Sequence, residues 1–161
     1  IRTPYWLVLG LLCGWMAFGV SAQSVNDGFD PAPDGTVAAL ALQDDGKVLV
    51  GGTFTSIAGQ SRAGLARLRA DGSVDPSFAN IPVSGLIAAI ALQTDGKIVV
   101  AGDFTQIGAA PRNGIARLNA DGSVDLGFDP DVDVGSDGVI RDIAVQTDGS
   151  IVLGGKFVTG F

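Results

Sequence analysis

The stretch VAALALQDDGKVLVGGTFT, residues 37–55, decides the fold because the chain repeats it. It recurs as IAAIALQTDGKIVVAGDFT at residues 87–105 and as IRDIAVQTDGSIVLGGKF at residues 140–157. Between residues 37–80 and 87–130, 25 of 44 positions are identical. Repetition with a period of about 50 residues indicates an array of structural units rather than one irregular domain.

Each unit also contains a second repeated stretch, GLARLRADGSVD at residues 64–75, which returns at residues 114–125 as GIARLNADGSVD. Both stretches place Asp-Gly between apolar, strand-like runs. In the first unit residues 37–43 and 47–54 flank one Asp-Gly pair, and residues 64–70 and 73–78 flank the other. Asp-Gly predicts a type I′ hairpin turn, since both residues tolerate positive φ. The sequence therefore predicts four short antiparallel strands per unit.

The apolar pattern predicts how these small sheets stack. Residues 37–42 are continuously apolar, so we expect both faces of this strand to be buried, with small residues such as Ala39 near a crowded axis. Later in the unit Ala66 and Leu68 alternate with more polar residues, and Pro76 suits an edge strand. The unit is thus expected to run from a buried inner strand to an exposed outer one. We predict an all-β fold of antiparallel four-stranded β-propeller blades, an incomplete arc of about two and a half blades.

The repeated motifs occur in a fixed order: QxDGK[IV][LV]VxGxFT, then RxG[IL]ARL, then ADGSVDxxF. In this order they resemble the bacterial delta-60 repeat, over about residues 27–161. The resemblance implies a β-propeller module of secreted or surface proteins with no settled biochemical function. The third copy departs from the pattern, with Ser150 in place of Lys and Val158 in place of Thr. Because propellers close with about four to eight blades, we expect further blades in the native chain and aggregation or oligomerisation of residues 23–161 alone.

The N-terminal segment differs in character from the repeats. Arg2 precedes an apolar run over residues 5–20 that ends in VSA at residue 22, a pattern typical of a cleaved secretory signal peptide. The alternative is a retained membrane anchor, although the run is short for a span of about 20 residues. The predicted organisation is a signal peptide (1–22), a lead-in segment (23–36), a first blade (37–86), a second blade with an acidic inter-blade loop (87–139) and a partial third blade (140–161). We expect a secreted or extracytoplasmic protein without membrane contact after cleavage.

Composition excludes several chemistries. The chain has no His, and all 17 of its acidic residues are Asp. A Ser/His/Asp triad, a His-ligated zinc, an HExxH metalloprotease and a Glu-based glycosidase are therefore excluded within it. The net charge of −7 disfavours nucleic acid, whose phosphates require a basic surface. We expect no catalytic site, no cofactor and no metal.

Several repeated residues are candidates for function or for structure. The Asp residues of the hairpins are expected to form turns; they are Asp45, Asp95 and Asp148. The repeated aromatic residues are expected to pack; they are Phe29, Phe54, Phe78, Phe104, Phe128 and Phe157. Four arginines could line a groove for an anionic ligand or pair with residues such as Asp75 and Asp125; they are Arg62, Arg67, Arg112 and Arg117.

One loop breaks the repeat. Asp129, Asp131, Asp133 and Asp137 are spaced like the first ligands of a calcium loop. However, Gly135 occupies the seventh position rather than the sixth, and the closing Glu is absent. We therefore favour an acidic inter-blade loop without bound metal, and a calcium site is the alternative.

These observations favour a non-enzymatic binding or structural module. Its partners would be a protein or glycan ligand at the loops 55–63, 105–113 and 129–138, together with further blades of the same chain. The alternative is a propeller fragment of a secreted polysaccharide-active hydrolase or lyase that uses Asp residues. The unrepeated Asp103, which replaces Thr53 of the first unit, is the candidate for that role.

Overall fold

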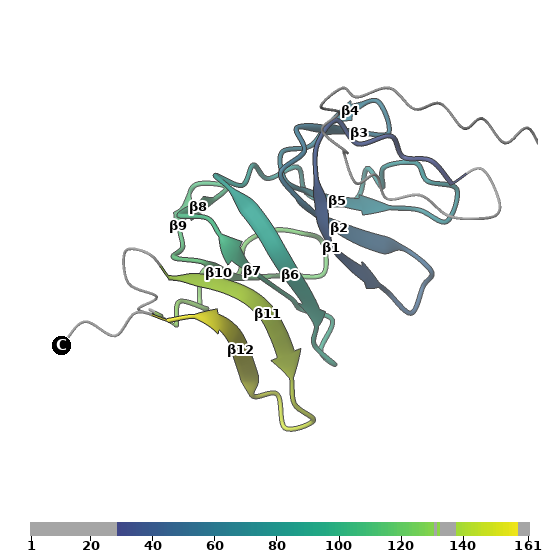
Figure 1. Ribbon diagram of the computed structural model, residues 1–161. Coiled ribbons are helices and arrows are strands. Elements are labelled where there is room, and N and C mark those ends of the chain that lie inside the picture. Colours follow the sequence, from purple (N-terminus) through teal and green to yellow (C-terminus); the bar gives the residue numbers. More distant parts are fainter. Residues whose placement is uncertain (1–28, 131, 133–137, 158–161) are drawn as a thin grey trace, which may run out of the picture.

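The computed structural model describes residues 29–130, 132 and 138–157. Within this part of the chain every regular element is a β-strand, and no helix is long and apolar enough to cross a membrane. The strands of three successive sheets are β1 (Val37–Leu42), β2 (Val48–Gly52) and β5 (Leu65–Leu68); β6 (Leu86–Leu92), β7 (Ile98–Asp103) and β10 (Ile115–Leu118); and β11 (Val139–Val145) and β12 (Ile151–Lys156). We call them the first, second and third blades. Figure 1 shows them following one another along an arc, with β6 packed between β1 and β11.

The blades share one backbone design. In the first blade β1 and β2 form a hairpin, and β2 also pairs with the shorter β5. In the second blade β6 and β7 form the hairpin, and β7 also pairs with β10. All of these pairings are antiparallel. Each hairpin carries a bulge in its first strand at the same place, between Val37 and Ala39 in the first blade. The bulges between Ile87 and Ala89 and between Ile140 and Asp142 repeat it. The repeat seen in the sequence is therefore also a repeat of backbone geometry.

The fourth strand predicted for each blade is reduced to a single bridge. Val74 bridges to Leu68 and Val124 bridges to Leu118, but neither residue begins a longer strand. The chain turns directly afterwards, since Phe78 N–H donates to the Asp75 carbonyl and the Asp75 side chain accepts the Ser77 N–H. The prediction of four full strands, with Pro76 in the last, is wrong for this reason.

The Asp-Gly hairpins form as predicted, but their turn type differs. Gly46 N–H donates to the Gln43 carbonyl at 2.9 Å, and Gly46 has φ of 80°. Asp45 has no positive φ and instead accepts the Lys47 N–H through its carboxylate at 3.1 Å. This is a type I turn followed by a left-handed glycine, a three-residue loop, rather than type I′. The prediction was wrong because Asp stabilises the turn with its side chain and leaves positive φ to Gly alone.

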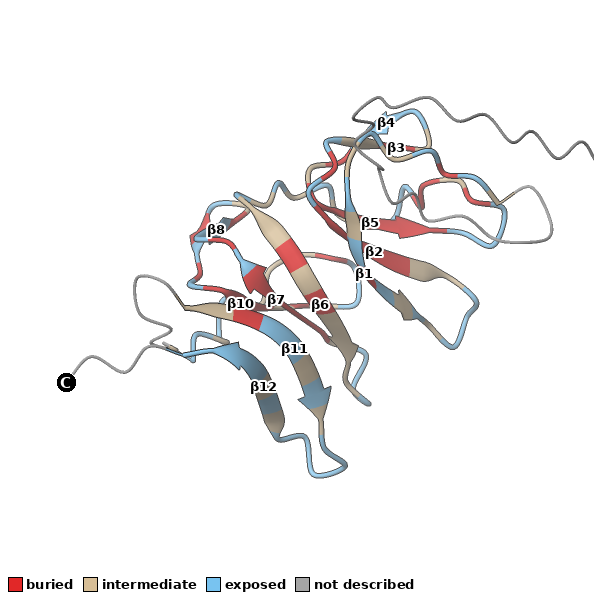
Figure 2. Cartoon of the chain, viewed as in Figure 1, coloured by how far each residue is buried: buried red, intermediate tan, exposed pale blue. Residues whose placement is uncertain are grey.

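The buried residues, red in Figure 2, form clusters between successive blades and one cluster within the first blade. Ala39 and Leu49 of the first blade pack with Ile98 and Val100 of the second. A further cluster joins the second blade to Ile140 of the third. Stacking of blades supplies these two clusters, whereas Val50, Ala66 and Leu68 on the other face of the first sheet are buried by Phe54, Ile57 and Val74 of the same blade.

The burial of the inner strands differs from the prediction. In β1, Leu40 and Leu42 are 58% and 70% exposed, whereas β6 contains no exposed residue and all of β5 is buried. The exposed face of β1 corresponds to the face of β6 that packs on the first blade through Ile90 and Leu92. The expected gradient from a buried inner strand to an exposed outer strand is therefore wrong for the first blade, and also for the second, where the outer strand β10 is more buried than β6. Burial of an inner strand depends on a neighbouring blade on each side.

Candidate functional site

The repeated Arg67 joins the first blade to the second. From β5, its Nε donates to Asp75 Oδ2 at 2.9 Å, and its Nη1 donates to the carbonyl of Ala120 in the second blade at 2.7 Å. The guanidinium also lies 4.7 Å from the centroid of the buried Phe78 ring. Arg67 is itself buried, so it is part of the core between the blades rather than the lining of a groove.

Arg117 repeats this arrangement in the second blade. Its Nε donates to Asp125 Oδ2 at 2.8 Å, and its guanidinium lies 4.5 Å from the Phe128 centroid. Lys97 donates to the same carboxylate oxygen at 2.7 Å. The hydrogen bonds from Lys97 and Arg117 lower the pKa of Asp125 to about 2. The predicted pairing of arginines with Asp75 and Asp125 is confirmed for Arg67 and Arg117.

The hairpin aspartates have the structural role that their position predicts. Asp45, Asp95 and Asp148 each accept the backbone N–H two residues further on, at 3.1, 3.0 and 2.9 Å. Such Asx contacts are what makes Asp favourable in turns. Among the described residues none of the three belongs to a cluster of acidic residues able to hold a metal ion.

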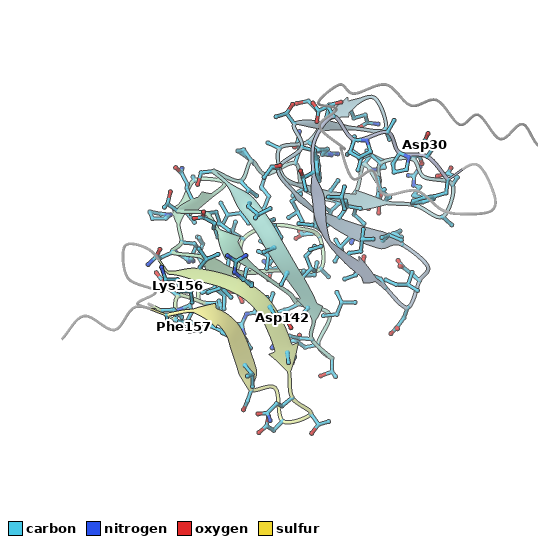
Figure 3. All side chains as sticks on the ribbon, in the orientation of Figure 1. Asp30, Asp142, Lys156 and Phe157 are labelled. Carbon is cyan, nitrogen blue, oxygen red and sulfur yellow. The ribbon has the colours of Figure 1, made fainter. Side chains whose placement is uncertain are left out.

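The repeated aromatic residues also pack, with one exception. Phe54, Phe78 and Phe104 are buried, and Phe29 and Phe128 pack partly buried against apolar clusters. Phe157, labelled in Figure 3 with Lys156 on the third blade, is instead 42% exposed. Phe54 is the counterpart of Phe157 in the first blade, and there the later residue Gly64 donates its N–H to the Phe54 carbonyl. The described residues contain no equivalent segment beside Phe157.

Arg112 lies in a cleft between two loops. The cleft has a volume of about 400 Å³ and lies between the loop 105–113 and residues 129, 130 and 132. Its lining residues are Thr105, Pro111, Arg112, Asn113, Ile115, Asp129, Pro130 and Val132. Asn113 Nδ2 donates to the Val132 carbonyl at 3.3 Å, a contact that links the two walls.

The charges of the cleft are paired. Arg112 is only 7% exposed, and its Nη1 donates to the Pro111 carbonyl at 2.7 Å and to Asp129 Oδ2 at 3.2 Å. Its Nη2 donates to the Leu126 carbonyl at 3.4 Å. Asp129 is largely exposed, so its second carboxylate oxygen remains available to a ligand. The cleft thus combines a neutralised ion pair, an amide and apolar walls.

Residues 43–78 and 93–128 each match a family described as a domain of unknown function, DUF5122, with a β-propeller fold. Two repeats of the chain therefore match the DUF5122 β-propeller model. Each match begins at the Gln before an Asp-Gly turn and ends at the Phe beneath Arg67 or Arg117. The β-propeller repeat expected from the motifs is therefore confirmed. A search of curated proteins returned no match.

The calcium alternative for the acidic inter-blade loop lies mostly outside the described residues. Asp131, Asp133 and Asp137 belong to the part that the structure does not describe. The described member, Asp129, accepts a hydrogen bond from the Arg112 guanidinium. The expectation of a loop without bound metal therefore stays a prediction, with calcium binding as its alternative.

Asp103, the candidate catalytic acid, lies at the end of β7 with its side chain exposed. Among residues 29–130, 132 and 138–157 it forms no ion pair. The same residues contain no group of three His, Cys, Asp or Glu able to hold a metal ion. The hydrolase or lyase alternative stays untested.

Sequence reasoning missed two features of the loops beside the sheets. The regions 55–63 and 105–113 contain two-residue hairpins, β3 (Ser56–Ile57) with β4 (Gln60–Ser61) and β8 (Gln106–Ile107) with β9 (Ala110–Pro111). Asp34 holds the first by accepting the N–H groups of Thr55 and Ser56, and Ser84 holds the second in the same way. A polar residue shortly before each inner strand was the available signal.

Proposed function

We propose that this chain is a segment of a secreted or cell-surface DUF5122 protein that binds a ligand through its loops and has no catalytic activity of its own. The cleft at Arg112, Asn113 and Asp129 is the observation that carries the proposal. Its polar groups project from loops held on stacked sheets, the arrangement in which a rigid scaffold presents binding residues. Secretion is supported by the signal-like sequence of residues 1–22.

The cleft chemistry favours a neutral, hydroxyl-rich ligand such as an oligosaccharide. Arg112 and Asp129 neutralise each other, so a charged ligand would have to displace one of them. Together with Asn113 they offer donors and acceptors side by side, which sugar hydroxyls can match in both senses. Pro130 and Val132 supply apolar surface for the C–H face of a ring.

Titration of the full chain with defined neutral oligosaccharides tests the proposal. Cello-, xylo-, chito- and malto-hexaose would be followed by calorimetry and by amide chemical shifts. We expect one series to bind, with shifts confined to the cleft residues and weakened at least about tenfold by Asn113→Ala, about the value of one hydrogen bond to a ligand. Gln60→Ala, an exposed residue of the matching loop in the first blade, is the control and leaves affinity unchanged.

Two outcomes would contradict the proposal. One is the absence of binding by any of the four series, and the other is binding that Asn113→Ala leaves intact. Chromatography of the oligosaccharides after incubation examines the rival function, since shortened products would reveal a hydrolase or lyase.

The open face of β1 supports a second partner, a further blade of the same chain. Leu40 and Leu42 occupy the positions of Ile90 and Leu92, which the first blade covers. The packing of the second blade on the Ala39 and Leu49 side of the first supports the same side of another blade as the partner of this face. Proteolysis of the native protein tests this, because β1 within a longer propeller would resist cleavage that the 161-residue chain alone permits.

A further inference from the structure

Arg62 is the counterpart of Arg112 in the first blade. Both lie at the end of the small hairpin loop, both are 7% exposed, and their backbone N–H groups donate to the carbonyls of Thr55 and Thr105 at 2.9 and 3.0 Å. In both residues Nε is buried without a hydrogen-bond partner. The two arginines therefore occupy equivalent sites in successive blades.

The two sites differ in what surrounds the guanidinium. Arg112 donates to two carbonyls and to the carboxylate of Asp129. Within the described part of the chain, the Arg62 guanidinium donates no hydrogen bond and forms no ion pair, a complete contrast with its counterpart. Of the three guanidinium nitrogens of Arg62, Nε alone is buried without a hydrogen-bond partner. The two Nη atoms, which also have no partner, are therefore in contact with solvent.

Two substitutions between the repeats explain the difference. The position of Asp129 is occupied in the first blade by Ala79, which has no carboxylate. The next residue, Asn80, donates its Nδ2 to the Ser61 carbonyl at 3.2 Å, the equivalent of the Pro111 carbonyl that accepts from Arg112. Arg62 has thus lost its counter-charge and one carbonyl acceptor together.

The equivalence of Ala79 and Asp129 rests on structure as well as on alignment. The preceding residues, Phe78 and Phe128, each donate their N–H at 3.2 Å to the carbonyl of the aspartate three residues earlier. Each ring also lies under the arginine of its own blade. The residue that follows the ring therefore leaves the blade from the same place in both units.

We propose that Arg62 and Ala79 form a binding site for a carboxylate ligand, whose carboxylate occupies the place that the Asp129 side chain fills in the second blade. A guanidinium remains charged at every physiological pH, and a charge removed from water without a partner is costly. A carboxylate relieves this cost by accepting from both Nη groups. The second blade shows a carboxylate beside the equivalent arginine, where Arg112 Nη1 donates to Asp129 Oδ2 at 3.2 Å.

Formate titration of the full chain at constant ionic strength tests the site. We expect the melting temperature to rise by about 2 °C at 100 mM formate relative to chloride, the size of shift given by a weak ligand near saturation. Glucuronate, compared with glucose, asks whether the site accepts a sugar acid as well as a bare carboxylate. Neither probe depends on the neutral-oligosaccharide cleft, so this inference and the proposed function fail separately.

Variants that exchange Ala and Asp between the two equivalent positions provide matched tests. Ala79→Asp installs the missing counter-charge and should abolish the formate response while raising the melting temperature in chloride. Asp129→Ala empties the second site and should add a second formate response. Arg62→Met keeps the side-chain bulk and should also abolish the response of the first site.

The proposal is overturned if formate has no effect on the unmodified chain, or if Ala79→Asp and Arg62→Met retain the full response. Because Ala79→Asp adds atoms at a partly exposed position, its failure to fold is not expected. Should Arg62→Met unfold the chain, Ala79→Asp and the gain expected for Asp129→Ala still decide the question.

Discussion

Replacing Asp75 by Asn should destabilise the chain strongly because it leaves Arg67 as a buried cation without its counter-charge. Asn has the shape of Asp and keeps one oxygen able to accept the Ser77 N–H, so packing is preserved. Arg67 keeps its bond to the Ala120 carbonyl, and this bond holds the guanidinium in place between the blades. The substitution therefore removes the negative charge and replaces the oxygen that accepts from Arg67 Nε by an NH2 group, with little change in volume.

The expected loss is about 3 kcal/mol. Side-chain exposures of 8% for Arg67 and 3% for Asp75 define a buried pair, and removal of one partner of such a pair costs about 3–5 kcal/mol. The lower end applies because the Ala120 carbonyl and the Phe78 ring still stabilise the guanidinium. With a urea m-value of about 1.5 kcal/mol/M, the midpoint would fall by about 2 M.

Urea unfolding of the full chain, followed by circular dichroism, measures this loss against two controls. Asp125→Asn makes the same change in the second blade, where the side chains of Asp125 and Arg117 are more exposed, at 14% and 23%. We expect a smaller loss there. The double variant Asp75→Asn/Arg67→Met removes the buried charge as well, and we expect it to be more stable than Asp75→Asn alone.

Equal losses for Asp75→Asn and Asp125→Asn would refute the reasoning, since burial would then have no influence on the value of the charge. A double variant no more stable than Asp75→Asn would show that Arg67 acts through packing rather than through an unpaired charge.

The stability lost in Asp75→Asn should depend on pH. Burial raises the pKa of Asp75, but the hydroxyl and backbone N–H of Ser77 and the Arg67 charge outweigh it and hold the pKa well below its usual range. A depressed folded-state pKa contributes stability above the unfolded value of about 3.9 and loses it as pH falls towards the folded value. The stability difference between the unmodified chain and Asp75→Asn should be constant from about pH 5 to 8 and should narrow below about pH 4.

Two further substitutions test the packing. Gly122→Ala should destabilise more than Gly96→Ala in urea: both glycines have positive φ, which costs Ala about 1 kcal/mol, but only at Gly122 would the new Cβ meet a buried aromatic ring, at 2.8 Å. Equal losses would mean that the ring moves aside. Leu42→Lys should lower the oligomeric or aggregated fraction of the 161-residue chain in sedimentation, because it places a charge on the open apolar face of β1. Leu126→Lys, at an equally exposed leucine in a turn, should not change that fraction, and a similar decrease for both would argue against a specific face.

The sequence predicted best what depends on neighbouring residues. The blades, the hairpin positions and the pairing of Arg67 with Asp75 all follow from short-range patterns that occur twice. The turn type was wrong because Asp-Gly is compatible with two loop geometries, and only the hydrogen bond of Gly46 to Gln43 distinguishes them.

What the sequence did not predict depends on contacts between blades. Leu40 and Leu42 look identical in pattern to Ile90 and Leu92, yet only the second pair has a blade packed against it. The bond from Arg67 to Ala120 joins residues 53 positions apart in different blades. No local pattern encodes either fact, since both follow from how one sheet is placed on the next.

The candidate sites lie where the two repeats differ while their architecture is the same. Arg67 and Arg117 pair with the equivalent Asp75 and Asp125 and lie over equivalent phenylalanine rings, and Arg67 also donates to the next blade. Arg62 and Arg112 are equally buried, yet a carboxylate neutralises only Arg112. One side chain after the packed phenylalanine therefore sets the charge of an entire loop face. In an array of nearly identical blades, a single exchange between Ala and Asp can make one face accept anions and the next accept neutral polar ligands, at little cost to the fold.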